Sequence, residues 1–235
     1  MPVTAARYDG HADWYETWSR PFVEGTAAAV RQLIGPGTGL CLDVGCGGGA
    51  YLDALAATGR TVVGLDRSAD QLRFARRRSR HVLQGDAAAL PFADGTFAAV
   101  AAIWISTDVD DYPAVTAEAA RVLRPGGLFA SYTAHPCFNG PHVEPLDDGV
   151  RVHPGYRISG WHRESAWWGF NVRRRVGMRQ HTLAELLTGF LSAGLVIEGV
   201  DEPGERPVPN VLAIRARKPA DPSARPRARS GPFPA

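Results

Sequence analysis

Short apolar runs alternate with amphipathic stretches between residues 20 and 135, the pattern that βαβ units on a parallel sheet produce. The first run ends in a cluster of glycines, and a turn is expected at 124–127, where Arg and Pro precede two glycines. In chain order the pattern predicts strand 39–44, helix 50–58, strand 61–65, helix 69–78, strands 81–84 and 97–105, helix 112–123 and strand 128–133.

The alternation breaks off after the fifth of these strands. Residues 136–178 are rich in Pro, Gly, His and Trp and have no clean period. Because structureless loops of this length are uncommon in compact domains, we expect an insertion with its own short strands or helices. A helix returns at 182–193, where Thr182 and Glu185 have the spacing of a capping box. The remaining segments are a hairpin of strands 195–200 and 211–216 and a tail at 218–235, whose low apolar content predicts disorder.

The composition indicates one folded domain, which we place at residues 1–217. The chain has 235 residues, of which 45% are hydrophobic and 21% charged. No apolar run approaches the roughly 18 residues that span a bilayer, and the N-terminus lacks the apolar core of a secretion signal. Cys41, Cys46 and Cys137 have neither a complete disulfide pattern nor a zinc-ligand spacing. We therefore expect reduced thiols, no metal site and a cytoplasmic location.

The net charge of the chain indicates which kind of molecule it binds. Lys and Arg number 26 against 24 Asp and Glu, a formal net charge of +2. A dedicated nucleic-acid binder usually carries a strong basic patch. The arginines between positions 73 and 80 fall on a predicted surface helix and fit a solvated face. We expect a small-molecule partner and neither nucleic acid nor membrane.

The strongest candidate for chemistry is the glycine cluster after the first strand. Gly45, Gly47 and Gly49 follow Asp43 at alternate positions, and glycines there let the backbone approach a ligand closely. In a doubly wound sheet this turn lies at the carboxyl ends of the strands, where ligands bind. Asp66 ends the second strand, 23 positions after Asp43. A carboxylate at that place can accept both ribose hydroxyls of an adenosine ligand.

Two classes of cofactor compete for this geometry. Gly45, Gly47 and Ala50 also fit the dinucleotide-binding pattern, which alone is a weak signal. Asp43 would repel a pyrophosphate but suits a ligand with an ammonium group. Asp86 follows the third strand, where it can accept a hydrogen bond from an adenine amine. Three acids at the ends of three consecutive strands therefore favour S-adenosylmethionine over a nicotinamide dinucleotide.

Four ordered motifs make a family resemblance specific. The stretches LDVGCGGGAYLDAL, VVGLDRS, GDAAALPFADGTFAAV and RVLRPGGLF, within residues 38–133, resemble the class I S-adenosylmethionine-dependent methyltransferases of the small-molecule branch. The resemblance implies an α/β, doubly wound, Rossmann-like fold. Its seven-stranded, mostly parallel sheet would carry an antiparallel C-terminal hairpin and an insertion after strand 5. One departure is Ala98, where the family often has an acid.

The resemblance also implies a set of cofactor-binding residues. The glycine loop would surround the methionine part, Asp66 would hold the ribose, and backbone at Ile103 would lie beneath the cofactor. The full set implied is Asp43, Gly45, Gly47, Gly49, Asp66, Arg67, Asp86, Ala87 and Ile103, with Asp86 and Ala87 at the adenine.

An aromatic segment at the N-terminus has two interpretations. In similar enzymes an N-terminal helix folds over the cofactor, and Tyr8 or Tyr15 would then touch the cofactor's carboxylate. The same aromatic residues could instead only pack against the core. The first interpretation makes residues 1–30 a helical lid.

The substrate side is less specific. A general base is needed only when the acceptor's nucleophile must lose a proton, and His135 and His181 are the candidates nearest to the sheet edge. Any single histidine is more often structural, and the same holds for Glu144. The aromatic residues of the insertion either line an acceptor pocket or pack the insertion onto the sheet, and the arginines at 173–175 are expected to face solvent. These aromatic residues are Tyr156, Trp161, Trp167, Trp168 and Phe170.

We expect an enzyme that moves the methyl group of S-adenosylmethionine to an oxygen or nitrogen of a small, aromatic or heterocyclic metabolite, in a bacterial specialised pathway. The alternatives are a nicotinamide-dependent oxidoreductase and a non-catalytic cofactor-binding protein. An RNA methyltransferase is disfavoured by the modest charge.

Overall fold

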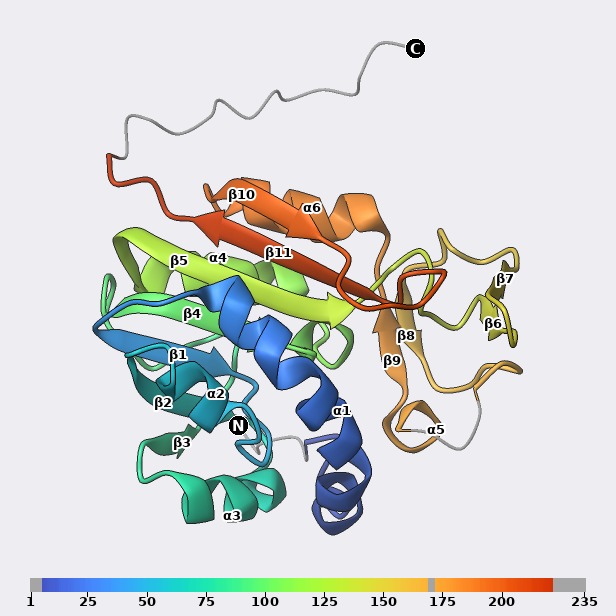
Figure 1. The fold of residues 1–235 in the computed structure, drawn as a ribbon, viewed down its shortest axis with the longest axis horizontal. Helices are drawn as coiled ribbons and strands as arrows, with labels where there is room; N and C mark the ends of the chain where they lie inside the picture. The colour runs from blue at the N-terminus through green and yellow to red at the C-terminus, as the bar shows by residue number, and fades with distance from the viewer. Residues whose placement is uncertain (1–5, 169–171, 222–235) are drawn as a thin grey trace.

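The computed structural model describes residues 6–168 and 172–221, and a seven-stranded sheet forms its centre (Figure 1). Strands β1 to β5 pair in parallel, whereas β11 runs antiparallel to both of its neighbours. The spatial order is β10 (Val196–Asp201), β11 (Val211–Arg217), β5 (Leu123–Ala134), β4 (Phe97–Ile103), β1 (Leu40–Val44), β2 (Thr61–Asp66) and β3 (Val82–Gln84). The predicted α/β fold and its antiparallel C-terminal hairpin are confirmed.

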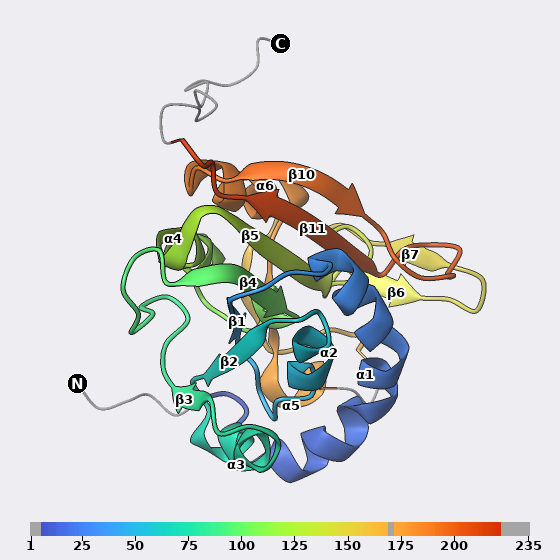
Figure 2. The ribbon, with the colours of Figure 1, turned by 60° about the vertical axis from the view of Figure 1, so that its left-hand side comes forward.

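Helices cover both faces of the sheet (Figure 2). One face packs against α1 (Ala12–Ile34), α2 (Leu52–Ala56) and α3 (Ala69–Arg78). The other face packs against α4 (Tyr112–Val122) and α6 (Leu183–Ser192). Along β4 the side chains alternate between the two cores, with Ala99 and Ala101 on the first face and Val100 and Ala102 on the second. A strand buried on both faces is apolar throughout, which is why this segment gave the longest apolar run of the chain.

The insertion after β5 contains short elements of its own, as expected. They are β6 (Val143–Pro145), β7 (Val150–Val152), β8 (Gly160–His162), α5 (Arg173–Val176) and β9 (Met178–Gln180). β6 pairs with β7 and β8 with β9, both antiparallel. In Figure 1 these elements lie on the side toward which the arrows of β1, β4 and β5 point. The insertion therefore borders the carboxyl ends of the parallel strands.

Several boundaries differ from the predicted ones. The N-terminal helix spans Ala12–Ile34 instead of lying within 1–30, and α2 is shorter than predicted. β4 ends at Ile103 because Trp104 adopts a left-handed backbone (φ 64°), after which a 3-10 helix, η1 (Ile105–Thr107), begins. The turn expected at 124–127 is instead the first part of β5, with a register shift in its pairing to β4. The predicted disordered tail lies outside the described residues from position 222 onward.

The start of α6 follows its sequence signal closely. The Thr182 hydroxyl accepts from the backbone N–H of Glu185 (3.1 Å), and the Glu185 carboxylate accepts from the Thr182 N–H (2.8 Å). The predicted capping box is thus confirmed.

Within residues 6–168 and 172–221, no helix combines the length and the apolar character needed to cross a bilayer.

Candidate functional site: a cavity at the carboxyl ends of the parallel strands

A cavity of about 1010 Å³ opens where β1, β2 and β4 end, beneath the N-terminal part of α1. Its lining combines the loop after β1, the loops after β2 and β3, the turn after β4 and the N-terminal segment. This is the switch-point position at which open α/β sheets bind ligands. Of the predicted cofactor residues, those that line it are Tyr8, Tyr15, Gly45, Gly47, Asp66, Arg67, Asp86, Ala87 and Ile103.

The loop after β1 is held close to the sheet by its backbone. The N–H groups of Gly45 and Cys46 both donate to the carbonyl of Leu65 (2.7 and 3.0 Å). Gly45 has φ 74°, and a Cβ there would lie 2.6 Å from Cδ1 of Ile105. A larger residue at Gly45 would therefore displace the floor of the cavity. Glycine at this position brings the backbone to the cavity wall, as the sequence predicted.

Two of the predicted residues lie behind the cavity wall. A Cβ at Gly49 would lie 3.1 Å from the Cα of Ala75, so this glycine allows the loop to pack against α3. Asp43 is only 2% exposed. Burial, and then the charge of Asp66, raise the pKa of its carboxyl group to about 7. Asp43 therefore does not line the cavity, and its carboxyl group is substantially protonated near neutral pH.

Asp66 joins the end of β2 to the glycine loop. Its Oδ2 accepts from the Gly47 N–H and its Oδ1 from the Ser68 N–H, both at 2.8 Å. Burial raises the pKa of this carboxyl group, although the same backbone hydrogen bonds oppose the rise. Each oxygen retains a further lone pair, so Asp66 can still accept hydrogen bonds from a ligand.

The loop after β3 presents a second acid. Asp86 is exposed, and its Oδ1 accepts from the N–H of Ala88 at 2.9 Å. Ala87 is buried beside it, and Ile103 is 6% exposed at the end of β4. These residues provide an apolar surface next to a polar acceptor, a combination that suits a purine base.

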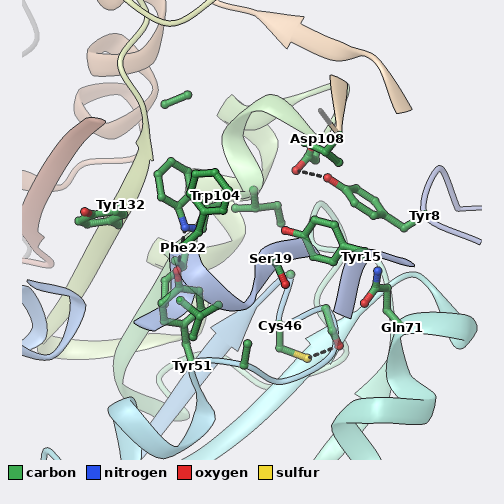
Figure 3. Close-up of a pocket in the computed structure, with 18 of the residues that line it drawn as sticks. Tyr8, Tyr15, Ser19, Phe22, Cys46, Tyr51, Gln71, Trp104, Asp108 and Tyr132 are labelled. Atoms are coloured by element: carbon green, nitrogen blue, oxygen red, sulfur yellow. Dashed lines mark hydrogen bonds between the residues drawn. The ribbon is translucent and has the colours of Figure 1, made fainter. Parts of the chain in front are cut away.

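Two tyrosines of the N-terminal segment, Tyr8 and Tyr15, line the cavity. The rings of Tyr8 and Tyr15 meet edge to face with centroids 5.0 Å apart, and the Tyr8 hydroxyl donates to Oδ2 of Asp108 (3.2 Å; Figure 3). Burial, followed by the charge of Asp108, raises the pKa of both tyrosine hydroxyls. Both hydroxyls stay protonated at neutral pH and can donate hydrogen bonds to a ligand.

Arg173 of the insertion contacts Asp108, the same acid that accepts from Tyr8. Its guanidinium forms a 2.6 Å ion pair with Asp108 and donates to the Thr107 hydroxyl (2.6 Å). The expectation that Arg173 faces solvent is therefore wrong, because its side chain is 15% exposed and paired with an acid that follows η1. Arg7 also lies 3.6 Å from the ring centroid of Trp161. The N-terminal segment, the turn after β4 and the insertion are thus connected above the cavity.

An aromatic wall that the sequence did not reveal forms the other end of the cavity (Figure 3). Trp104 and Tyr132 meet edge to face at 5.2 Å, and the Trp104 indole N–H donates to the Tyr51 hydroxyl (2.9 Å). Phe22 of α1 lines the same region. Trp104 is the only non-glycine residue with a positive φ among the described residues. Such a conformation is uncommon outside glycine and concentrates at functional sites. The sequence did not indicate this conformation, because the apolar run 97–105 predicted one continuous strand through Trp104.

The predicted bases lie outside this cavity. None of the seven histidines lines it, and all seven are in the described part of the chain. His135 Nε2 lies 2.8 Å from Glu202 Oε1, and His135 Nδ1 accepts from the Cys137 N–H. His181 Nε2 lies 3.0 Å from the Ser106 carbonyl. Both are buried, and Nε2 of each makes a local contact, so neither histidine presents a base to this cavity.

The other candidates of the insertion have structural contacts. Glu144 pairs with Arg151 and His153, and the His153 ring stacks on Trp167. The Tyr156 hydroxyl accepts from the Leu183 N–H. None of the predicted insertion aromatics among the described residues lines the cavity, and Phe170 lies outside those residues. The packing interpretation therefore holds for the four that are described.

The fold matches that of solved methyltransferases. The chain has the fold of the class I S-adenosylmethionine-dependent methyltransferases. A solved S-adenosylmethionine dependent methyltransferase from Mesorhizobium loti matches with a TM-score of 0.68 and 23% identity, over 83% of this chain and 99% of that chain. A geranyl diphosphate C-methyltransferase from Streptomyces coelicolor, solved with S-adenosyl-L-homocysteine, matches with a TM-score of 0.60 and 18% identity, over 83% and 80% of the two chains.

Sequence comparison finds similar proteins among the methyltransferases. Residues 42–131 match the methyltransferase domain family, and the resemblance inferred from the four motifs is confirmed. The chain is 41% identical over 109 residues to a fatty-acid O-methyltransferase of Mycolicibacterium smegmatis, covering 44% of this chain and 40% of the relative. It is 34% identical over 145 residues to a demethylmenaquinone methyltransferase of Renibacterium salmoninarum, covering 58% and 61%. The chain thus spans 40% and 61% of the lengths of these two curated relatives.

Proposed function

We propose that this protein transfers the methyl group of S-adenosylmethionine to an oxygen or nitrogen of a small, aromatic or heterocyclic metabolite in the bacterial cytoplasm. One observation carries the proposal: a single cavity joins the glycine loop and Asp66 to an aromatic wall formed by Trp104 and Tyr132. The first part suits an adenosine-bearing cofactor and the second a planar acceptor. Specialised metabolism would be the setting.

The residues present fit the cofactor. The cavity is large enough for a nucleoside cofactor together with a small acceptor. Asp66 would bind the ribose hydroxyls, Asp86 and Ala87 the adenine, and the backbone at Gly45 and Gly47 the methionine part. The carboxyl group of Asp66, which lines the cavity beside the glycine loop, favours a cationic ligand over a pyrophosphate. The nicotinamide alternative has no comparable support.

The protein's contribution to the reaction would be alignment and exclusion of water. S-adenosylmethionine supplies a methyl group on a positively charged sulfur, and the transfer is an in-line displacement. The Trp104 and Tyr132 rings would hold the acceptor beneath α1, and the N-terminal segment would keep the cavity dry. The protonated hydroxyls of Tyr8 and Tyr15 would donate hydrogen bonds and take up no proton.

A second acceptor class is favoured by one relative and one structural feature. The relative from Mycolicibacterium smegmatis is named a fatty-acid O-methyltransferase. A carboxylate acceptor has already lost its proton at neutral pH and needs no base, which agrees with a cavity that no histidine lines. An apolar carboxylic acid is therefore the second candidate.

The first experiment is calorimetric titration with S-adenosylmethionine, S-adenosylhomocysteine and NADH. We expect micromolar binding of the first two and none of NADH. Asp66→Ala should weaken binding about 100-fold or more, because each hydrogen bond to a charged group contributes about 1.5–3 kcal/mol. Asp147→Ala changes an exposed acid remote from the cavity lining and is the matched control. Unchanged affinity in a folded Asp66→Ala variant would contradict the ribose assignment.

The acceptor is then identified with a labelled methyl group. A panel of phenols, heterocyclic amines and medium-chain fatty acids separates the two candidate classes. Phe22→Ala should raise KM for the acceptor while leaving cofactor affinity within about threefold, because Phe22 lines the aromatic end and is already 50% exposed. Transfer to fatty acids alone would replace the first candidate with the second.

A further inference from the structure

Gln71 has a buried side-chain amide that no group in the described part of the chain hydrogen-bonds. It lies in the first turn of α3, where its backbone N–H donates to the Ser68 hydroxyl. The side chain is 2% exposed, yet neither Oε1 nor Nε2 has a hydrogen-bond partner among residues 6–168 and 172–221. Buried amides are nearly always hydrogen-bonded in folded proteins, since an unpaired one is costly. An amide left unpaired in this way requires an explanation.

The position of Gln71 supplies one. Gln71 lines the cavity, and a Cβ on Gly47 would lie 3.8 Å from its Oε1. Gly47 is the residue whose N–H donates to Asp66. In Figure 3 the amide of Gln71 extends from α3 toward Tyr15, on the cavity side of the glycine loop. The unpaired amide therefore lies where the loop and the acid of β2 meet.

We propose that the Gln71 amide binds the amino-acid end of S-adenosylmethionine, an inference that rests on the proposed function. A primary amide offers one carbonyl acceptor and two N–H donors. Its carbonyl would accept from the ligand's ammonium group, and its N–H groups would donate to the ligand's carboxylate. Asp66 already serves the ribose in this arrangement, so the amide beside Gly47 is assigned to the next part of the ligand along the glycine loop.

This assignment predicts that affinity and stability change in opposite directions. Gln71→Met has a similar length and cannot hydrogen-bond. It would remove the unpaired amide and raise the melting temperature of the ligand-free protein by about 2–4 °C. The same variant would bind S-adenosylhomocysteine about 10- to 100-fold more weakly, because it loses hydrogen bonds to charged groups. A residue with only a structural role would not show this opposition.

The test uses two ligands that differ only at the proposed contact. Methylthioadenosine keeps the adenosine and the sulfur but lacks the amino-acid end, so its affinity for Gln71→Met should stay within about threefold of the unaltered protein. Gln71→Glu keeps the volume but places a second acid beside the ligand's carboxylate, and it too should lose S-adenosylhomocysteine selectively. Gln32→Met, on the exposed surface of α1, is the matched control.

The outcomes are distinct. Selective loss of S-adenosylhomocysteine supports the assignment. Affinity within threefold for both ligands, or an equal loss of both, overturns it while leaving the proposed function intact. If the unaltered protein binds S-adenosylhomocysteine no better than NADH, the proposed function fails and this inference fails with it.

Discussion

The buried carboxyl group of Asp43 gives a prediction that the structure makes quantitative. It lies in β1 with 2% exposure, beneath the glycine loop. Burial first, and the charge of Asp66 second, raise its pKa from 3.8 to about 7. We expect Asp43→Asn, which has nearly the same shape and no charge, to change how the stability of the ligand-free protein depends on pH.

The sign follows from proton binding. Between pH 4 and pH 7 the folded protein keeps the Asp43 proton that the unfolded chain releases, so the free energy of unfolding falls as the pH rises. The pKa change from 3.8 to about 7 corresponds to about 4 kcal/mol in total. The Asn variant lacks this loss. The free energy of unfolding of the Asn variant should therefore exceed that of the unaltered protein by an amount that grows with pH and levels off above pH 7.

The assay is urea denaturation of both proteins at pH 5, 6, 7 and 8. All other titrating groups are shared, so the difference between the two free energies of unfolding isolates Asp43 to first order. That difference should grow by about 2–3 kcal/mol between pH 5 and pH 8. Parallel pH profiles would refute the reasoning. Saturating S-adenosylhomocysteine should flatten the difference if its ammonium lies near Asp43, because a nearby positive charge lowers the carboxyl pKa.

Two further predictions concern the surroundings of the cavity. Arg173→Met should cost up to about 3 kcal/mol in the free energy of unfolding, because it leaves Asp108 without its cation; the double variant with Asp108→Asn should recover part of that loss, and additive losses would argue against the pair. Once an acceptor is known, His135→Gln and His181→Gln should each keep kcat/KM within about fivefold. A loss of about 100-fold or more, the usual contribution of a general base, would restore a base role to that residue.

The sequence predicted which residues gather at the carboxyl ends of the parallel strands, and most of them line the cavity, because local signals determine their place. Gly45 needs a positive φ and a close approach to Ile105, which only glycine tolerates, so its function can be read from residue type. Asp66 and Asp86 follow strands of one parallel sheet, and parallel strands bring their carboxyl ends to one edge. Apolar strand segments that alternate with helical ones, each followed by an acid, therefore predict both the fold and this part of the cavity.

The aromatic end of the cavity depends on contacts between distant segments. Arg173 pairs with Asp108 across 65 positions of the chain, and nothing near either residue indicates the other. Trp104 turns toward Tyr51 and Tyr132 because one residue leaves the strand for a left-handed conformation, which an apolar run conceals. The histidines had suitable chemistry, yet Glu202 and the Ser106 carbonyl engage them. Residue type and period determine backbone structure locally, whereas the direction and partners of a side chain are determined only when the segments pack together.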